Sequence, residues 1–152
     1  MYVYRPAGPA DLDLICRQRR EMFLDAGRTG AVLDEMAGPF RDWLARKLAS
    51  GDYLGWIVEA DGAPVGGVGM QVIDWAPGPN HPTQDRRGYI LNVFVEPEHR
   101  GRGLADRLMQ IAEDEGRGRG LDFMTLNATE KGRPLYARRG WAAGNEMRLS
   151  LK

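Results

Sequence analysis

The spacing of apolar side chains in the first third of the chain changes from strand-like to helical. Residues 2–5 predict a short strand, because Pro6 cannot continue a ladder and keeps the residue before it extended. Apolar residues at roughly helical intervals then predict a helix that begins after Asp11 and is broken at Gly27. The same spacing predicts a second helix over residues 34–49, with a glycine just past its end.

Strand-like patterns follow over residues 53–60 and 65–75. The Asp61-Gly62 pair between these two apolar runs is typical of a hairpin turn. Three glycines, at positions 66, 67 and 69, interrupt the second run, which indicates a bulge or the close approach of another group, or else a simple irregularity at a sheet edge. Residues 75–88 are rich in proline and predict an irregular loop.

The second half of the chain contains a run that reads as a fully covered strand. Residues 89–95 are almost continuously apolar, as expected of a central strand with helices on both faces. An amphipathic stripe predicts a helix from Leu104 that ends at Gly116. Residues 121–126 predict a strand and residues 133–139 a short helix, with a last strand region over residues 141–151. This order predicts one α/β (α+β) sheet domain over residues 1–152.

Composition narrows the class of protein. The 21 basic and 21 acidic side chains cancel, which argues against a nucleic-acid or anionic-membrane binder that works by bulk electrostatics. The lone Cys16 excludes an internal disulfide and a cysteine-based zinc cluster, and with two histidines no metal site is expected. The chain shows no apolar signal core and no membrane span, so we expect a cytoplasmic protein.

The most informative segment is Arg100-Gly101-Arg102-Gly103-Leu104-Ala105, between a strand and a helix. The N–H groups of a helix N-terminus and the helix dipole favour an anion, and glycines let a phosphate approach the backbone. Arg100 and Arg102 could add charge-assisted contacts. The alternative is a strand-to-helix connection that is flexible because of its glycines, with arginines exposed to solvent and no ligand. The string Gly-x-x-x-x-Gly-Lys-Ser/Thr of a P-loop is absent, and the match to a dinucleotide fingerprint is weak.

Two motifs carry a family resemblance. The segment from Val95 to Ala105 resembles the acetyl-CoA-binding motif of the GCN5-related N-acetyltransferases, Arg/Gln-x-x-Gly-x-Gly/Ala, which Arg100, Gly103 and Ala105 fill. Downstream, Leu135-Tyr136-Ala137-Arg138-Arg139-Gly140-Trp141 is similar to the family's Leu-Tyr-x-x-x-Gly-Phe. The two motifs stand at the family's usual separation. Together they cover about a third of the chain, and a pair of motifs in context is far more specific than a single glycine motif.

The resemblance implies a mixed, mostly antiparallel central sheet with flanking helices, in which the strand over residues 89–95 splays away from the strand over residues 121–126. The cleft would hold acetyl-CoA as cosubstrate, with the pantetheine amides on the first strand, the pyrophosphate on the glycine turn, and a backbone N–H near residues 92–94 for the oxyanion. The cofactor-binding residues that it implies are Val93, Phe94, Val95, Arg100, Gly101, Arg102, Gly103, Leu104, Ala105, Asp106 and Asn127.

Tyr136 maps onto the family's tyrosine beside the coenzyme sulfur, which implies a role as general acid to the leaving thiolate; the alternative is a half-buried core tyrosine. The sequence departs from the family pattern at Thr129, where many relatives have an asparagine, and Asn127 is a candidate to replace its contact. The strand over residues 121–126 also lacks the glutamate that some relatives use as base. Candidate bases are Glu21, Glu59, Asp74 and Asp85, each more readily read as a surface charge.

The leading hypothesis is an N-acetyltransferase in which a small-molecule or peptide amine attacks acetyl-CoA directly in a ternary complex. The alternatives are a non-catalytic acyl-CoA-binding or regulatory module on the same fold, and a nucleic-acid binder that uses the Arg-Gly pairs, which the neutral charge disfavours. The N-terminal helices and the loop over residues 75–88 would recognise the acceptor. Arg17, Arg19 and Arg20 are candidates, although a solvated helix face is the favoured interpretation, and the Arg86-Arg87 pair would meet an acidic acceptor or nothing. A homodimer through the last strand is possible in sequence terms, because that edge would otherwise be exposed.

Overall fold

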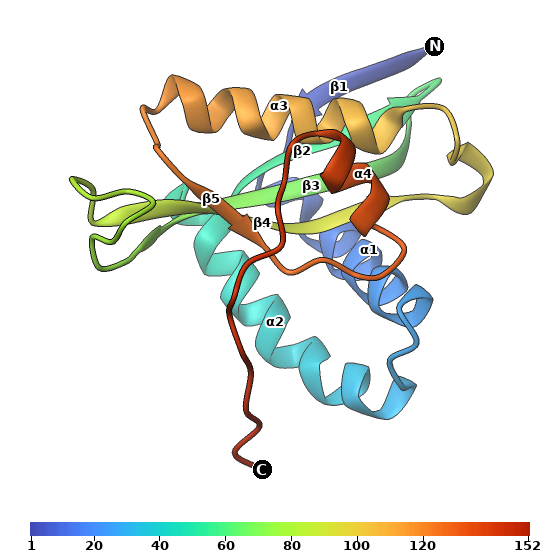
Figure 1. The fold of residues 1–152 in the computed structure, drawn as a ribbon. Coiled ribbons are helices and arrows are strands. Elements are labelled where there is room, and N and C mark those ends of the chain that lie inside the picture. Colours follow the sequence, from blue (N-terminus) through green and yellow to red (C-terminus); the bar gives the residue numbers. More distant parts are fainter.

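A computed structural model describes all residues from Met1 to Lys152. Five strands form one sheet in the order β1-β2-β3-β4-β5, with helices on both faces (Figure 1). The pairs from β1 to β4 are antiparallel, whereas β4 and β5 are parallel. The mixed, mostly antiparallel sheet with flanking helices is the fold class that the sequence predicts. None of the helices is both long and apolar enough to span a bilayer.

The elements follow the order expected from the sequence, apart from the C-terminal strand. The strands are β1 (Tyr2–Pro6), β2 (Leu54–Ala60), β3 (Ala63–Asp74), β4 (Arg86–Val95) and β5 (Met124–Leu126). The helices are α1 (Leu12–Asp25), α2 (Gly30–Ser50), α3 (Leu104–Gly118) and α4 (Arg133–Arg138), with short 3-10 turns η1 (Pro9–Asp11) and η2 (Pro97–His99).

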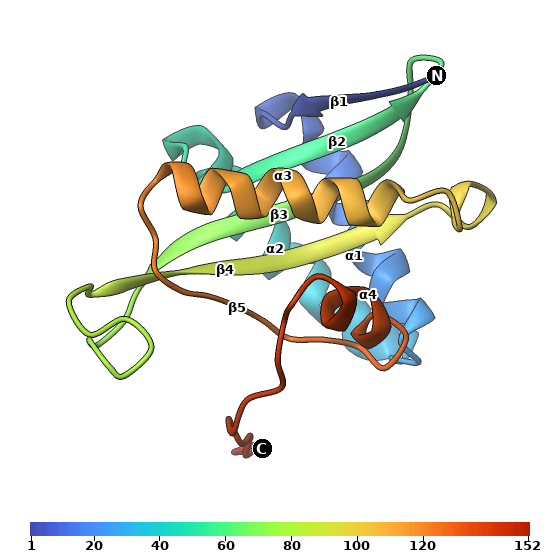
Figure 2. The same ribbon diagram turned by 45° about the horizontal axis from the view of Figure 1, so that its top comes forward.

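The two faces of the sheet carry separate apolar cores. Figure 2 shows α3 along one face and α1 and α2 behind the sheet. Under α3, the fully buried Leu108 and Met109 pack with Met70 and Ile90 of the sheet. Under α1 and α2, the core is made by Ile15, Phe40, Leu44, Leu48, Tyr53 and Ile57. The near-continuous apolar character of β4 follows from this, because each face of the strand meets a helix layer.

Helix α2 begins four residues earlier than the apolar spacing predicts. Thr29, in extended conformation, precedes its first residue Gly30, and the helix continues through Pro39. The apolar spacing does not extend to the first turn, in which Leu33 is the one buried residue. The predicted glycine stop is confirmed: Gly51 has a left-handed φ of 79°, which only glycine adopts without strain.

The glycines of β3 mark a close approach, not a sheet edge, since β3 lies between β2 and β4. A Cβ at Gly69 would stand 2.0 Å from the Tyr53 hydroxyl, and one at Gly67 would stand 2.7 Å from Gln18 Oε1. The register with β4 shifts between these glycines, so that Val68 faces two residues of β4. The interpretation as a bulge with close side-chain approach is therefore confirmed, and edge irregularity is wrong.

The pairing of β4 with β5 is short. It covers three residue pairs and ends at Ile90 opposite Leu126. Beyond that point β4 continues to Val95, paired only with β3 on its other side. The strands therefore splay, as expected, and the backbone of residues 91–95 is open on the β5 side. This open stretch leads through η2 into the glycine turn before α3.

The predicted strand over residues 141–151 is wrong, because no residue after α4 belongs to a strand. Both views show this C-terminal arm, residues 142–152, leaving the body of the molecule (Figures 1 and 2). Its local pattern is strand-like, with Met147, Leu149 and Leu151 alternating with polar residues, yet these three side chains are 92%, 83% and 91% exposed. A strand needs a neighbour to pair with, and the arm has none within its own chain. In consequence β5 is an edge strand.

Candidate functional site

The glycine turn, residues 100–103, follows β4 and η2 and leaves the N-terminus of α3 uncapped. Gly101 and Gly103 have φ of 75° and 77°, left-handed values that favour glycine, and a Cβ at either would meet open space. Gly103 is the residue before α3, and no side chain caps the helix. The first backbone hydrogen bond runs from Arg107 N to Gly103 O, so the amides of residues 104–106 have no helical partner. An anion can be held here by backbone N–H groups and the helix dipole.

The two arginines of the turn have other contacts. Arg100 donates from Nε to the Val95 carbonyl and pairs through Nη2 with Asp25 at the end of α1, 2.6 Å away. Arg102 donates to the hydroxyl of Tyr2 in β1. Both side chains therefore tie the turn to neighbouring elements, and its anion-binding capacity lies mainly in the backbone amides. The remaining predicted contact, Asn127, is exposed in the connection after β5.

Tyr136 belongs to α4. This helix lies beside the part of β4 that β5 leaves open (Figures 1 and 2). Its half-buried ring packs against the core under α3, as does Val93 of the open stretch. Burial raises the pKa of the Tyr136 phenol above its usual range, so the phenol remains a neutral donor at neutral pH. The Thr129 hydroxyl accepts a hydrogen bond of 3.1 Å from the amide of Gly132, the residue before α4, so it is engaged in the turn that leads into this helix.

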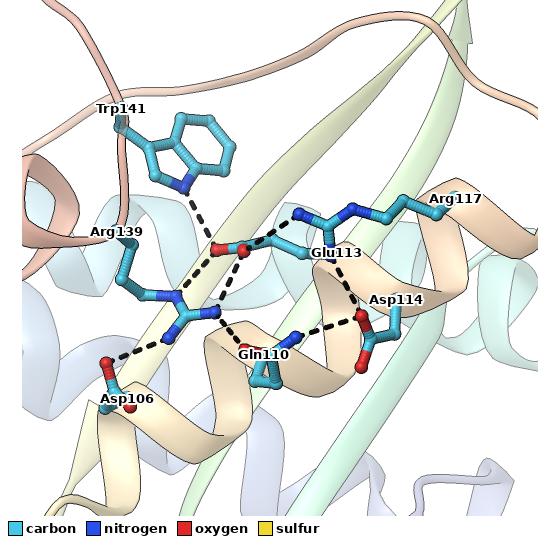
Figure 3. Close-up of polar contacts among 7 residues, drawn as sticks. All are labelled: Asp106, Gln110, Glu113, Asp114, Arg117, Arg139 and Trp141. Atoms are coloured by element: carbon cyan, nitrogen blue, oxygen red, sulfur yellow. Dashed lines mark hydrogen bonds and ion pairs between the residues drawn. The ribbon is translucent and has the colours of Figure 1, made fainter.

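An ion-pair network holds α4 against α3 (Figure 3). Arg139, just after α4, forms two parallel hydrogen bonds with Glu113, from Nε at 2.8 Å and from Nη2 at 2.9 Å. The same guanidinium reaches Asp106 and Gln110, and the Trp141 indole donates to Glu113 at 3.1 Å. These contacts fix the position of the helix that carries Tyr136. Asp106 is itself in the first turn of α3, so the network connects both predicted motifs.

A polar chain on the opposite side of β4 was not predicted. Asn92 stands at the bulge with a φ of 58° and is 4% exposed. Its amide donates to the buried Tyr53 hydroxyl at 2.9 Å, and its oxygen accepts from Arg19 Nη1 at 2.6 Å. Leu91 also packs on this face, so the bulge turns two consecutive side chains toward α1 and α2. The sequence signal was a single amide inside an apolar strand.

The other two arginines of α1 form ion pairs with carboxylates outside the strands. Arg17 pairs with Glu96 at 2.7 Å and Arg20 with Asp34 at 2.9 Å, in keeping with a solvated helix face. For Arg19 the interpretation as a solvated residue is wrong, because its side chain is largely buried beneath α2. A hollow of about 310 Å³ lies between α1 and α2, lined by Cys16, Arg17, Arg20, Leu33, Met36, Ala37, Phe40 and Arg41.

The candidate bases remain apart from Tyr136 and Asn92. Glu59 pairs with Arg5 of β1, and Asp74 and Asp85 are exposed at the ends of the loop between β3 and β4. Glu21, on α1, has no ion-pair partner. No carboxylate forms a hydrogen bond with Tyr136 or Asn92.

The Arg86-Arg87 pair serves the β3–β4 loop. Arg87 donates to Nε2 of the fully buried His81 and lies 4.4 Å from the Trp75 ring centre. His81 Nδ1 in turn donates to the Gln84 carbonyl, so this histidine holds the loop. Arg86 donates to a backbone carbonyl beyond α3. These contacts account for both arginines within the chain.

The splayed strands, the open helix end and the tyrosine helix define the protein as an acetyltransferase of the GCN5-related class. The chain belongs to this family: the model for the acetyltransferase (GNAT) family matches residues 16–141.

Particular relatives agree with this assignment. The chain is similar to a GCN5-related N-acetyltransferase from Ralstonia eutropha JMP134, with 50% identity, 99% of each chain covered and a TM-score of 0.98. It is also similar to a predicted acetyltransferase from Clostridium acetobutylicum, solved with acetyl-CoA, with 28% identity over 99% of this chain and 97% of that one and a TM-score of 0.91.

A curated relative is a glucosamine 6-phosphate N-acetyltransferase from Trypanosoma brucei brucei, 35% identical over 65 residues. The match covers 42% of this chain and 44% of that protein, so it spans less than half of either.

Proposed function

We propose that this protein transfers an acetyl group from acetyl-CoA to an amine, in a ternary complex and without a covalent enzyme intermediate. The observation that carries the proposal is the end of β4–β5 pairing at Ile90, which leaves β4 open from Leu91 to Val95, the part of the strand that leads through η2 to the glycine turn. An extended pantetheine arm, with two amides, can pair with such an edge as an added strand. The acetyl-CoA bound to the Clostridium relative supports this cosubstrate.

The coenzyme would lie along residues that the fold aligns. The backbone of Val93, Phe94 and Val95 would bind the pantetheine amides, and the amides of the turn and of Leu104, Ala105 and Asp106 would bind the pyrophosphate. Asn127, exposed after β5, would contact the coenzyme from the other side of the opening. Gly101 and Gly103 allow the phosphates to approach closely, while Arg100 and Arg102 add positive charge at the turn.

In the proposed reaction the chain supplies two groups, a backbone N–H for the oxyanion and a phenol that acts as general acid. The amine nitrogen attacks the thioester carbonyl carbon, and the oxyanion that forms accepts a hydrogen bond from a backbone N–H near Asn92. The C–S bond then breaks, and Tyr136 gives its phenolic proton to the departing sulfur. The amine proton goes to water, because no carboxylate lies against Tyr136 or Asn92. A raised phenol pKa keeps Tyr136 protonated until the sulfur needs the proton.

Calorimetric titration with acetyl-CoA and a thiol-release assay over a panel of amines test this function. Gly103→Ala is expected to weaken acetyl-CoA binding about tenfold or more, because a Cβ strains the turn and covers amides that bind the phosphates. Gly120→Ala is the matched control: its φ is 72° and its surroundings are equally open, but it follows the far end of α3. Equal affinity in the two variants would contradict the assignment. Saturable acetyl-CoA binding without thiol release on any amine would favour the non-catalytic module.

We also propose that the protein is a homodimer in which each C-terminal arm adds to the β5 edge of the other chain. Two incomplete features support it: β5 is an edge strand of three residues, and the arm presents Met147, Leu149 and Leu151 on one side while remaining almost fully exposed. The edge strand has unpaired backbone groups and the arm has exposed apolar side chains, so both are stabilised by pairing with another strand. Reciprocal exchange satisfies both with two-fold symmetry.

Light scattering after size-exclusion chromatography tests the dimer. The wild-type protein is expected to elute with twice the mass of the chain. Replacing Met147, Leu149 and Leu151 together by serine is expected to give monomers, because the apolar side of the arm is lost. Arg148→Ser changes the opposite side of the same arm and should leave the dimer intact. A monomeric wild-type protein at all concentrations would contradict the proposal.

A further inference from the structure

Arg19 differs from the other two arginines of α1, Arg17 and Arg20, in having no acidic partner. Arg17, Arg20 and Arg41 each pair with a carboxylate of the same region, and Arg100 pairs with Asp25. The ionisable groups that act on Arg19 are Tyr53, Tyr89 and Cys16, none of which is a carboxylate. Burial raises the pKa of both Tyr53 and Cys16, which keeps these two groups uncharged at neutral pH. Its positive charge is therefore uncompensated within the chain.

The charge is also partly withdrawn from water. The Arg19 guanidinium lies over the rings of Phe23 and Phe40, with 4.9 Å and 4.4 Å to the ring centres. Its Nε is fully buried without a hydrogen-bond partner. Burial lowers the pKa of Arg19, although an arginine stays charged at neutral pH. A buried cation without a counter-ion raises the free energy of the folded protein. An anion bound at this place would pair with the charge and accept hydrogen bonds from the unused donors.

Arg19 is tied to the reacting end of β4. Its one hydrogen bond to another side chain runs from Nη1 to the oxygen of Asn92, at the bulge and next to the open residues 93–95. A neighbouring amide, Gln18 Nε2, is buried without a partner as well, in a side chain only 2% exposed. Two adjacent residues of α1 thus bring unused donors to the face of the sheet opposite α3, Gln18 beside Gly67 of β3 and Arg19 beside Asn92 of β4. Helices α1 and α2 cover this face of the sheet, next to the position proposed for the thioester near Asn92.

We propose that Arg19 binds the anionic group of the acceptor, so that the substrate is an amine that also carries a carboxylate or a phosphate. This inference rests on the proposed acetyl transfer and names its substrate class. An anion held by Arg19 places the remainder of the acceptor beside Asn92, while the aromatic rings of Phe23 and Phe40 keep water from the pair. Removal of water strengthens an ion pair and makes the preference for an anion large.

Matched acceptor pairs test the inference and separate the two sources of the anion. One pair is an amino acid and its amide; the other is glucosamine 6-phosphate and glucosamine. The wild-type protein is expected to favour the anionic member of at least one pair, measured as the ratio of kcat/KM values. Arg19→Met is expected to lower that ratio about 30-fold or more, mainly through KM of the anionic acceptor. Arg19→Lys keeps the charge and should fall in between, and it decides the question if Arg19→Met does not fold.

Arg20→Met is the control, because Arg20 is the next residue of the same helix and pairs outward with Asp34. It is expected to leave the ratio unchanged. A wild-type protein that acetylates both members of each pair equally, or an equal ratio in Arg19→Lys and the wild type, would overturn the inference while leaving acetyl transfer intact. Calorimetric binding of the same pairs to the CoA-saturated protein gives a readout without turnover. Binding preference without acetylation of any acceptor would overturn the proposed function alone.

Discussion

Replacing Tyr136 by phenylalanine is expected to lower kcat by about 100-fold or more, since it removes one hydroxyl and with it the proton for the leaving thiolate. The affinity for acetyl-CoA should change little, because the ring still packs against the core under α3. Steady-state thiol release against acetyl-CoA and acceptor concentration measures the effect. The wild-type rate should also fall at strongly alkaline pH, where the phenol with its raised pKa finally ionises, and this fall should disappear in Tyr136→Phe.

Tyr4→Phe is the matched control for this change. Tyr4 is also half-buried, and burial raises the pKa of its phenol as well, but it lies in β1, three strands away from β4. The same loss of a hydroxyl is expected to leave kcat unchanged there. An undiminished kcat in Tyr136→Phe across the pH range would exclude Tyr136 as the general acid, even if the protein acetylates amines.

Arg139→Met is expected to lower the free energy of unfolding by about 3–5 kcal/mol, because it leaves the carboxylate of Glu113 buried without its partner. Both side chains of this pair are about nine-tenths buried, at 11% and 9% exposure, so solvent screens the interaction little. For a domain of this size the loss corresponds to a fall in Tm of roughly 10 °C. Differential scanning calorimetry measures it. Because the network holds the helix that carries Tyr136, the rate of acetyl transfer should also fall in Arg139→Met at temperatures where the variant remains folded.

Arg117→Met provides the comparison for Arg139. Arg117 approaches the same Glu113 to 3.8 Å from one turn further along α3, but its side chain is 66% exposed. An exposed pair of this kind contributes about 0–1 kcal/mol, so little change in Tm is expected. The double variant Arg139→Met with Glu113→Leu should recover part of the lost stability, since it removes the unpaired charge. Equal Tm values for the two single variants would mean that the network does not hold α4.

Local pattern was sufficient for most elements and for both motifs of the site. The apolar run of β4 and the stripe of α3 reflect burial that each residue experiences on its own face, so periodicity predicts them. Gly101 and Gly103 signal a turn for a similarly local reason, because their backbone conformation excludes side chains. The same holds for Gly51 at the end of α2.

Contacts between residues far apart in the sequence do not follow from local pattern. The link from Arg19 through Asn92 to Tyr53 joins α1, β4 and the start of β2, and nothing in the neighbours of any one of them indicates the others. The partners of Arg139 are likewise 26–33 residues away. Such networks depend on how the helices lie on the sheet, which is a property of the whole fold.

The C-terminal arm separates the two kinds of information most clearly. The sequence by itself determined the local character of residues 147–151, where apolar and polar side chains alternate as in a strand. Only the tertiary structure decided that this segment has no partner within its own chain, and that β5 is left as an edge. The physical reason is that a strand is completed by hydrogen bonds to another strand, whereas a helix such as α3 satisfies its backbone within its own sequence.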